Sequence, residues 1–138
     1  MANHTHKGAC MCGAVQIEAK GDPVWTATCH CADCRHATGA AMAGFAGYET
    51  ENVKIEGGDF CEFESSTNTR RGFCGKCGTR LTCRMESYPT QTHFHVGIFE
   101  DADVFAPMGN VYVKDKLKWV HLEENIPSFQ TTPNAEKN

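Results

Sequence analysis

The sequence has few long apolar runs, no excess of basic residues and no apolar leader. No stretch approaches the roughly 20 apolar residues that a membrane-spanning helix requires. The formal net charge is −4, from 13 basic and 17 acidic residues, so the chain lacks the summed positive field that attracts phosphate backbones. The first residues, MANHTHKGACMCG, are polar and contain no signal-peptide core. We therefore expect a cytoplasmic chain whose partners are neither nucleic acid nor membrane.

Cysteine, by contrast, is abundant, with nine in 138 residues. Outside secreted proteins, such a count indicates metal binding or catalysis rather than a disulfide framework, and an odd number of thiols cannot be fully paired. Cys61 and Cys83 stand alone and are expected to be buried thiols in strands. The others form three motifs, CMC, CHCADC and CGKC, which contain Cys10 and Cys12, then Cys29, Cys31 and Cys34, then Cys74 and Cys77.

The spacing within these motifs is typical of zinc ligands. Zinc binds thiolates at about 2.3 Å in tetrahedral geometry, and one or two intervening residues allow a backbone turn to wrap around the ion. The CMC and CGKC motifs together provide four thiolates, which is the complement of a closed structural site. We therefore expect Cys10, Cys12, Cys74 and Cys77 to meet, provided that the fold brings these two distant pairs together.

The CHCADC motif provides three thiolates, and its spacing alone leaves two interpretations open. It is either a catalytic site whose fourth ligand is substrate or water, or a second closed site completed by one of His30, His36, Cys61 and Cys83. Three thiolates on Zn²⁺ leave a formal charge of −1, which favours activation of a thiol over activation of water. Arg35, and Arg71 next to Arg70, flank the motifs and are candidates to bind substrate carboxylates, although surface arginines are more often simply solvated.

Short alternating runs indicate a mostly β fold with one or two short helical turns. We expect strands over residues 14–19, 52–57, 60–65, 92–99, 110–115 and 118–123. The clearest helical segment covers residues 32–38, with Gly39 placed to cap its C-terminus. The aromatic residues, Trp119 among them, are expected mainly in the core, whereas His93 and His95 share one exposed strand face and the acidic turn around Asp101 is solvated.

Five segments in order, CMCGAV, CHCADCRHATG, RRGFCGKCGTRL, VGIFED and KWVHLEENIPSF, resemble the glutathione-dependent formaldehyde-activating enzyme family, also called the centromere protein V-like family. The resemblance extends from about Gly8 to Phe129 and implies a single Mss4-like domain over residues 1–138, an assembly of small sheets stapled by zinc, with a core at 8–129 and a flexible tail at 130–138. It implies two zinc ions. The structural ion would bind Cys10, Cys12, Cys74 and Cys77, and the catalytic ion would bind Cys29, Cys31 and Cys34.

The resemblance also implies an activity. The family reaction joins glutathione to formaldehyde, giving S-hydroxymethylglutathione, and is classed with the carbon–sulfur lyases. The partners are then a small thiol and a small aldehyde, and the oligomeric state stays open. Asn110 departs from the pattern, because the family commonly places a histidine there.

Two other functions are compatible with the motifs. The first is a non-catalytic Mss4-like binding module in which both zinc ions are structural. The second is a zinc-ribbon nucleic-acid binder, which CGKC suggests and the acidic charge disfavours.

Overall fold

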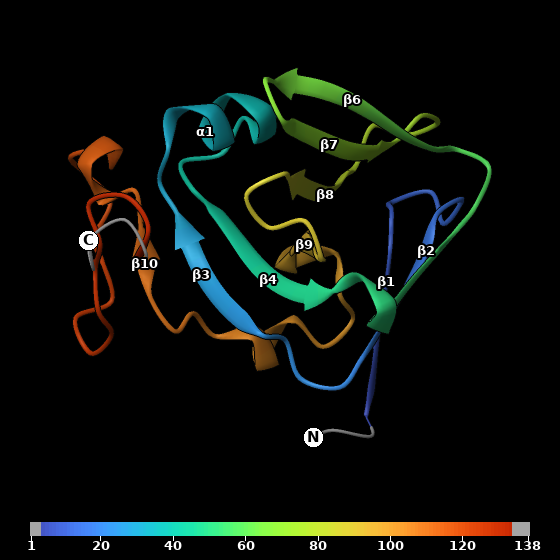
Figure 1. Ribbon diagram of the computed structural model, residues 1–138, viewed down its shortest axis with the longest axis horizontal. Helices are drawn as coiled ribbons and strands as arrows, with labels where there is room; N and C mark the ends of the chain where they lie inside the picture. Colours follow the sequence, from blue (N-terminus) through green and yellow to red (C-terminus); the bar gives the residue numbers. More distant parts are fainter. Residues whose placement is uncertain (1–3, 134–138) are drawn as a thin grey trace. The chain divides into compact units, whose positions relative to one another are not determined.

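A computed structural model of the protein describes residues 4–133, and Figure 1 shows its ribbon. The chain folds into two compact units, and it passes between them within β3, within β4 and after Val104. The first unit contains the residues up to Trp25 together with Ala46–Val104. The second contains Thr26–Phe45 and the residues from Phe105 onward.

The fold is mostly β, as the alternating runs predict. The strands are β1 (Thr5–Ala9), β2 (Gln16–Lys20), β3 (Trp25–Cys29), β4 (Ala43–Glu49), β5 (Val53–Glu56), β6 (Phe60–Ser66), β7 (Thr69–Cys74), β8 (Arg80–Met85), β9 (Gln91–His95) and β10 (Asn110–Val111). The helical elements are α1 (Ala32–Thr38) and the 3₁₀ turns η1 (Thr50–Asn52), η2 (Val96–Ile98), η3 (Ala102–Phe105) and η4 (Val113–Asp115). Within residues 4–133, no helix is long and apolar enough to cross a membrane.

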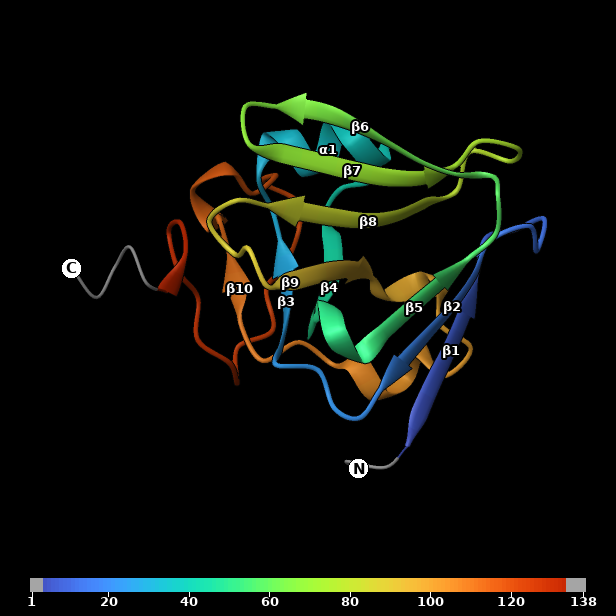
Figure 2. The same cartoon turned by 45° about the vertical axis from the view of Figure 1, so that its right-hand side comes forward.

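In the first unit, β1, β2 and β5 form a small antiparallel sheet in the order β1–β2–β5, which Figure 2 shows face on. Side chains alternate along β2, so Ile17 and Ala19 are buried while the other three residues of the strand are exposed. Ile17 pairs with Gly8 on one side and Ile55 on the other. One apolar face of this sheet therefore contributes to the core of the unit.

The same unit contains an antiparallel ladder in which β6, β7, β8 and β9 follow one another. Leu81 and Phe94 are completely buried and are among the largest core side chains. Gly72 on β7 allows close packing, because a Cβ atom there would lie 2.1 Å from the hydroxyl of Thr82. The hairpin between β7 and β8 is the segment that carries CGKC.

In the second unit, the end of β3 leads directly into α1, and β10 pairs with β3 in parallel (Figure 1). The register places Asn110 opposite Thr28 and Val111 opposite Cys29. Helix α1 begins after Cys31 and ends at Gly39, whose φ of 69° is the left-handed conformation that glycine adopts readily. The predicted helix and its cap are therefore confirmed.

The structure also corrects several expectations. The run at 118–123 forms no strand, and the run at 110–115 is a strand only in its first two residues before η4 begins. Trp119 is 69% exposed instead of contributing to the core, and His93 is 2% exposed instead of facing solvent. Cys83 is buried in β8 as expected, whereas Cys61 in β6 is only partly buried. The single-domain prediction stays a prediction, and residues 134–138 of the predicted tail lie outside the described residues.

Candidate metal centres and thiol site

The first unit brings the CMC and CGKC motifs together, as the sequence predicts. Cys10 and Cys12 lie in the turn between β1 and β2, while Cys74 ends β7 and Cys77 lies in the turn before β8. The four Sγ atoms all lie within 4.8 Å of one another. Two turns that are distant in sequence thus form one cluster of thiols.

The sulfur–sulfur distances match a tetrahedral zinc site. The Sγ atom of Cys12 lies 3.6 Å from that of Cys10 and 3.8 Å from that of Cys74. Four sulfurs at about 2.3 Å from a zinc ion in a tetrahedron are about 3.8 Å apart. A disulfide would require about 2.05 Å, and all nine cysteines are free thiols.

Hydrogen-bond donors surround this cluster. The backbone N–H of Val15 donates to Cys10 Sγ at 3.2 Å, and that of Cys77 donates to Cys74 Sγ at 3.4 Å. The hydroxyl of Thr79 lies 3.1 Å from Cys77 Sγ and accepts the backbone N–H of Met11 at 3.0 Å. Such donors stabilise thiolates and orient them toward a bound ion.

The ionisation of these thiols is unequal without a cation. The hydroxyl and backbone N–H of Thr79 lower the pKa of Cys77 to about 5. Burial opposes ionisation of Cys10, but the backbone N–H of Val15 and the neighbouring thiols outweigh it, so the pKa of Cys10 is lowered. At the exposed Cys12, a backbone hydrogen bond at Ala14 favours ionisation, but desolvation and the neighbouring thiols together outweigh it and raise the pKa to about 11. Like charges this close oppose joint ionisation, which a divalent cation would relieve.

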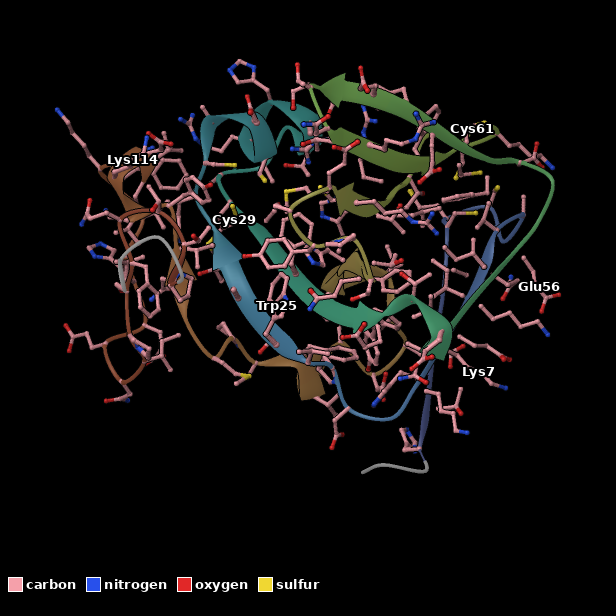
Figure 3. All side chains as sticks on the ribbon, viewed as in Figure 1. Lys7, Trp25, Cys29, Glu56, Cys61 and Lys114 are labelled. Atoms are coloured by element: carbon pink, nitrogen blue, oxygen red, sulfur yellow. The ribbon has the colours of Figure 1, made fainter. Side chains whose placement is uncertain are left out.

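The second unit assembles the CHCADC thiols around the start of α1. Cys29 ends β3, as Figure 3 shows, Cys31 is the N-cap residue of α1, and Cys34 lies in its first turn. The backbone N–H of Cys34 donates to Cys31 Sγ at 3.3 Å, and the three Sγ atoms lie within 4.8 Å of one another. Hydrogen bonds with the thiols of Cys31 and Cys34 raise the pKa of Cys29 far above its usual range. This donor set also suits zinc.

Among the described residues, none of the four candidate fourth ligands belongs to this cluster of thiols. The group contains the three thiols alone. His30 is completely buried, and its Nε2 atom lies 3.4 Å from the hydroxyl of Thr28. His36 is exposed on α1, while Cys61 and Cys83 belong to strands of the first unit.

The two predicted carboxylate-binding arginines differ in their surroundings. Arg35 follows Cys34 directly in α1, and its Nε atom is buried without a hydrogen-bond partner among residues 4–133. Arg71 is buried in β7 of the first unit, where its Nε atom donates to Ser65 Oγ at 3.1 Å. Arg71 therefore has a hydrogen bond within its own unit, whereas the Nε atom of Arg35 is a buried donor without a partner among the described residues.

Asn110 supports the strand that carries Cys29. It is 2% exposed and accepts a hydrogen bond from the hydroxyl of Thr28, the residue opposite it on β3. Its side-chain amide donates to Ser128 Oγ at 3.2 Å. Position 110 thus holds a buried, hydrogen-bonded amide.

One further cluster of possible ligands was not predicted from the sequence. The side chains of His4, His6 and Asp101 converge in the first unit, so Asp101 is not simply solvated as expected. The only signal in the sequence was the two-residue spacing of HTH, which places both rings on one face of a strand. Nothing local in the sequence predicted that Asp101 would meet them.

Comparisons with known proteins bear on the fold and on the family of the chain. A crystal structure of a Rhodobacter sphaeroides protein is similar to the chain at 21% identity with a TM-score of 0.57, and the match covers 88% of this chain and 98% of that one. That similarity shows a shared fold. No curated protein gives a significant match. The family model described as glutathione-dependent formaldehyde-activating enzyme matches residues 5–115, which include all three cysteine motifs. The chain therefore belongs to the glutathione-dependent formaldehyde-activating enzyme family.

Proposed function

We propose that the protein is a zinc-dependent enzyme of the carbon–sulfur lyase type that forms or cleaves the adduct of a small thiol and a small aldehyde. The observation that carries the proposal is the cluster of Cys29, Cys31 and Cys34, which contains three thiols and no fourth protein ligand among the described residues. Three protein ligands are the usual complement of a catalytic zinc site, whereas structural sites have four. By the family's name, the substrates are glutathione and formaldehyde.

The chemistry requires an ionised thiol and a carbonyl carbon. Zinc held by Cys29, Cys31 and Cys34 would supply thiol activation, because coordination deprotonates a thiol and leaves the sulfur nucleophilic. In the adduct-forming direction, the glutathione sulfur adds to the aldehyde carbon, so that a carbon–sulfur bond forms while the carbonyl double bond becomes a single bond. The thiol proton passes to solvent, and the carbonyl oxygen takes a proton from water. The reverse direction cleaves the same bond.

The protein's own residues hold and orient the substrate. The ligands themselves lie on a rigid frame, because Cys31 caps α1 and Cys29 ends a strand paired with β10. Arg35 follows Cys34 in α1 and has a buried Nε donor without a partner among the described residues, which suits a carboxylate of glutathione. Arg71, which the sequence suggested for a second carboxylate, belongs to the first unit and donates a hydrogen bond to Ser65 Oγ, so that role stays a prediction.

Native mass spectrometry of reduced protein, purified without added metal, tests the thiol-binding part. We expect one zinc ion in each of the two cysteine clusters, and one bound glutathione when the thiol is added. The Cys31→Ser variant should lose the glutathione, whereas Cys61→Ser, which removes a thiol outside both clusters, should retain it. Two zinc ions without thiol binding would overturn the proposal and favour a binding module with two structural ions.

Exchange spectroscopy tests the reaction itself, because the adduct also forms without a catalyst. With ¹³C-formaldehyde and glutathione at equilibrium, the wild-type protein should accelerate exchange between the free aldehyde and S-hydroxymethylglutathione. Cys31→Ser should leave the rate at its uncatalysed value, and Arg35→Ala should weaken glutathione binding by about tenfold, the worth of one charge-assisted hydrogen bond. An unaltered exchange rate with wild-type protein would exclude this reaction.

A further inference from the structure

His4, His6 and Asp101 converge on one point in the first unit and share no residue with either cysteine cluster. The Oδ2 atom of Asp101 lies 2.6 Å from His6 Nδ1 and 3.6 Å from His4 Nε2. The two imidazole rings contact each other edge to face, with centroids 4.6 Å apart. One ligand atom from each residue lies within 4.8 Å of the others.

The backbone fixes this convergence. Glu100 donates its N–H to the carbonyl of Lys7 at 2.8 Å, and Gly8 forms a β-bridge with Phe99. The approach is so close that a Cβ atom on Gly8 would lie 2.7 Å from the carbonyl oxygen of Ile98. On the other edge, β1 pairs along its whole length with β2. The segment before Asp101 is thus held against the strand that carries His6.

Asp101 contacts more imidazole rings than a single ion pair requires. A single imidazole would pair with Asp101, yet both His4 and His6 direct a ring nitrogen at the same carboxylate oxygen. The second oxygen, Oδ1, is buried and has no hydrogen-bond partner within residues 4–133. His6 is itself 5% exposed, while His4 lies on the solvent side. The cluster is therefore buried at its base and open at its rim.

The donor set fits a transition metal. Ligand atoms at about 2.0–2.2 Å from a tetrahedral zinc ion are roughly 3.3–3.6 Å apart. The distance from Asp101 Oδ2 to His4 Nε2, 3.6 Å, lies at the upper end of this range, and the distance to His6 Nδ1, 2.6 Å, lies below it. Two imidazoles and a carboxylate are borderline ligands that bind zinc and related divalent ions, in contrast to the soft thiolate clusters. We propose that His4, His6 and Asp101 form a third metal site, for a divalent transition-metal ion bound by two imidazoles and one carboxylate.

A metal ion bound at this site would cross-link the start of β1 to the segment after η2. His6 and Asp101 are 95 residues apart in sequence, so a bound ion would close a long loop. Only the folded chain brings these ligands together, and binding therefore stabilises the fold.

Native mass spectrometry and a competition titration with a zinc chelator test the proposal on full-length protein whose two cysteine clusters are already filled with zinc. Zinc is the probe. Because both cysteine clusters already contain zinc, added zinc does not replace a different ion there, and any further bound zinc reports a new site. We expect a third zinc ion on the wild-type protein. His4→Ala and Asp101→Asn should weaken its affinity at least about tenfold, because each removes one of three ligands. His121→Ala and Asp103→Asn, which alter an exposed histidine and an exposed carboxylate elsewhere, should retain it.

Two further measurements make the test independent of folding and of the proposed enzyme activity. His4 is exposed and precedes β1, so His4→Ala should melt like the wild type when both are free of the third ion. Side-chain NMR of the histidines should show zinc-dependent shifts for His4 and His6 and none for His121. The proposal is overturned if wild-type protein binds no third zinc ion at micromolar concentrations, or if the ligand variants bind it as tightly as the controls do.

Discussion

The Sγ atoms of Cys12 and Cys74 lie 3.8 Å apart, although 62 residues separate the two cysteines in sequence. This distance joins the turn after β1 to the end of β7 and so ties two sheets of the first unit together. The thiols of Cys29, Cys31 and Cys34, in contrast, lie within one local turn around the start of α1. The two clusters should therefore differ in how much of the fold depends on them.

Replacement of a ligand should reveal this difference. Cys74→Ser removes a completely buried ligand from the four-thiol cluster and should lower Tm by on the order of 10 °C, because a structural zinc site contributes directly to folding. Cys31→Ser should shift Tm by only a few degrees while abolishing thiol binding. Thermal melts followed by circular dichroism measure both effects. Equal losses of cooperative melting in the two variants would contradict the division into structural and catalytic sites.

The turn after β5 offers a test of packing next to the four-thiol cluster. Gly57 has a φ of 128°, and a Cβ atom there would lie 2.1 Å from the carbonyl oxygen of Ala14, the residue before the Val15 that hydrogen-bonds Cys10. Gly57→Ala should therefore cost about 2–4 kcal/mol of unfolding free energy, through backbone strain and overpacking. Urea denaturation of zinc-loaded protein gives this value.

Gly58→Ala is the matched control for that substitution. A Cβ atom on this neighbouring glycine would meet no atom within 4 Å beyond its own chain neighbours, and its φ lies outside the left-handed region. Its replacement should leave the urea midpoint within error of the wild type. If both variants unfold at the wild-type urea concentration, the close approach of Gly57 to Ala14 does not hold in solution.

The fold was predictable where the signal was local. The spacing of CHCADC and the glycine after residues 32–38 predicted the thiol cluster and α1 because both depend on a single turn. Strand β4 was missed because its sequence, AGFAGYE, is rich in small residues instead of branched ones. Its Gly47 is required, since a Cβ atom there would lie 2.4 Å from the ring of Trp25. Packing between strands, which a sequence pattern does not reveal, selected those residues.

Contacts between distant segments were also the difficulty in predicting the candidate sites. The meeting of Cys10 and Cys12 with Cys74 and Cys77 was expected from the count of ligands that zinc requires, although no local pattern joins the two pairs. The contact between His6 and Asp101 had no such count to predict it, because three residues of mixed type do not stand out in a chain with 17 acidic residues and seven histidines. Long-range pairing of backbone segments created that cluster.

Burial of His93 should make stability depend on pH. Its ring packs edge to face against Trp25, and its Nε2–H donates a hydrogen bond to Gln91 Oε1 at 2.9 Å. Burial lowers the pKa of His93 from 6.5 to about 4. Below pH 6.5 the unfolded chain binds a proton that the folded chain excludes, so stability should fall as the pH decreases from 6.5 toward 4 and be fully present above 6.5. The shift corresponds to roughly 3 kcal/mol at most.

Urea denaturation of wild-type and His93→Gln protein between pH 5 and 7.5 measures this contribution. The variant should show a shallower decline below pH 6.5, and His121→Ala, which alters an exposed histidine, should follow the wild type. Loss of zinc from the cysteine clusters affects all three proteins alike, so the difference between the curves isolates His93. Parallel curves for wild type and His93→Gln would show that this histidine titrates equally in both states.

Asn110 provides a test of how the second unit supports the three thiols. Its amide group bonds Thr28 and Ser128 while almost fully buried, so Asn110→Ala would leave the polar groups of both partners with one bond fewer. We expect a loss of about 1–3 kcal/mol in unfolding free energy, against no measurable change for Asn125→Ala at an exposed position.

The same variant should also weaken glutathione binding, because Asn110 lies one register position from the pair formed by Val111 and Cys29. Titration calorimetry at saturating zinc would measure this effect. A variant that loses stability but binds glutathione normally would limit Asn110 to a structural role in β10. If neither property changes, the buried network around Asn110 contributes nothing to the protein in solution.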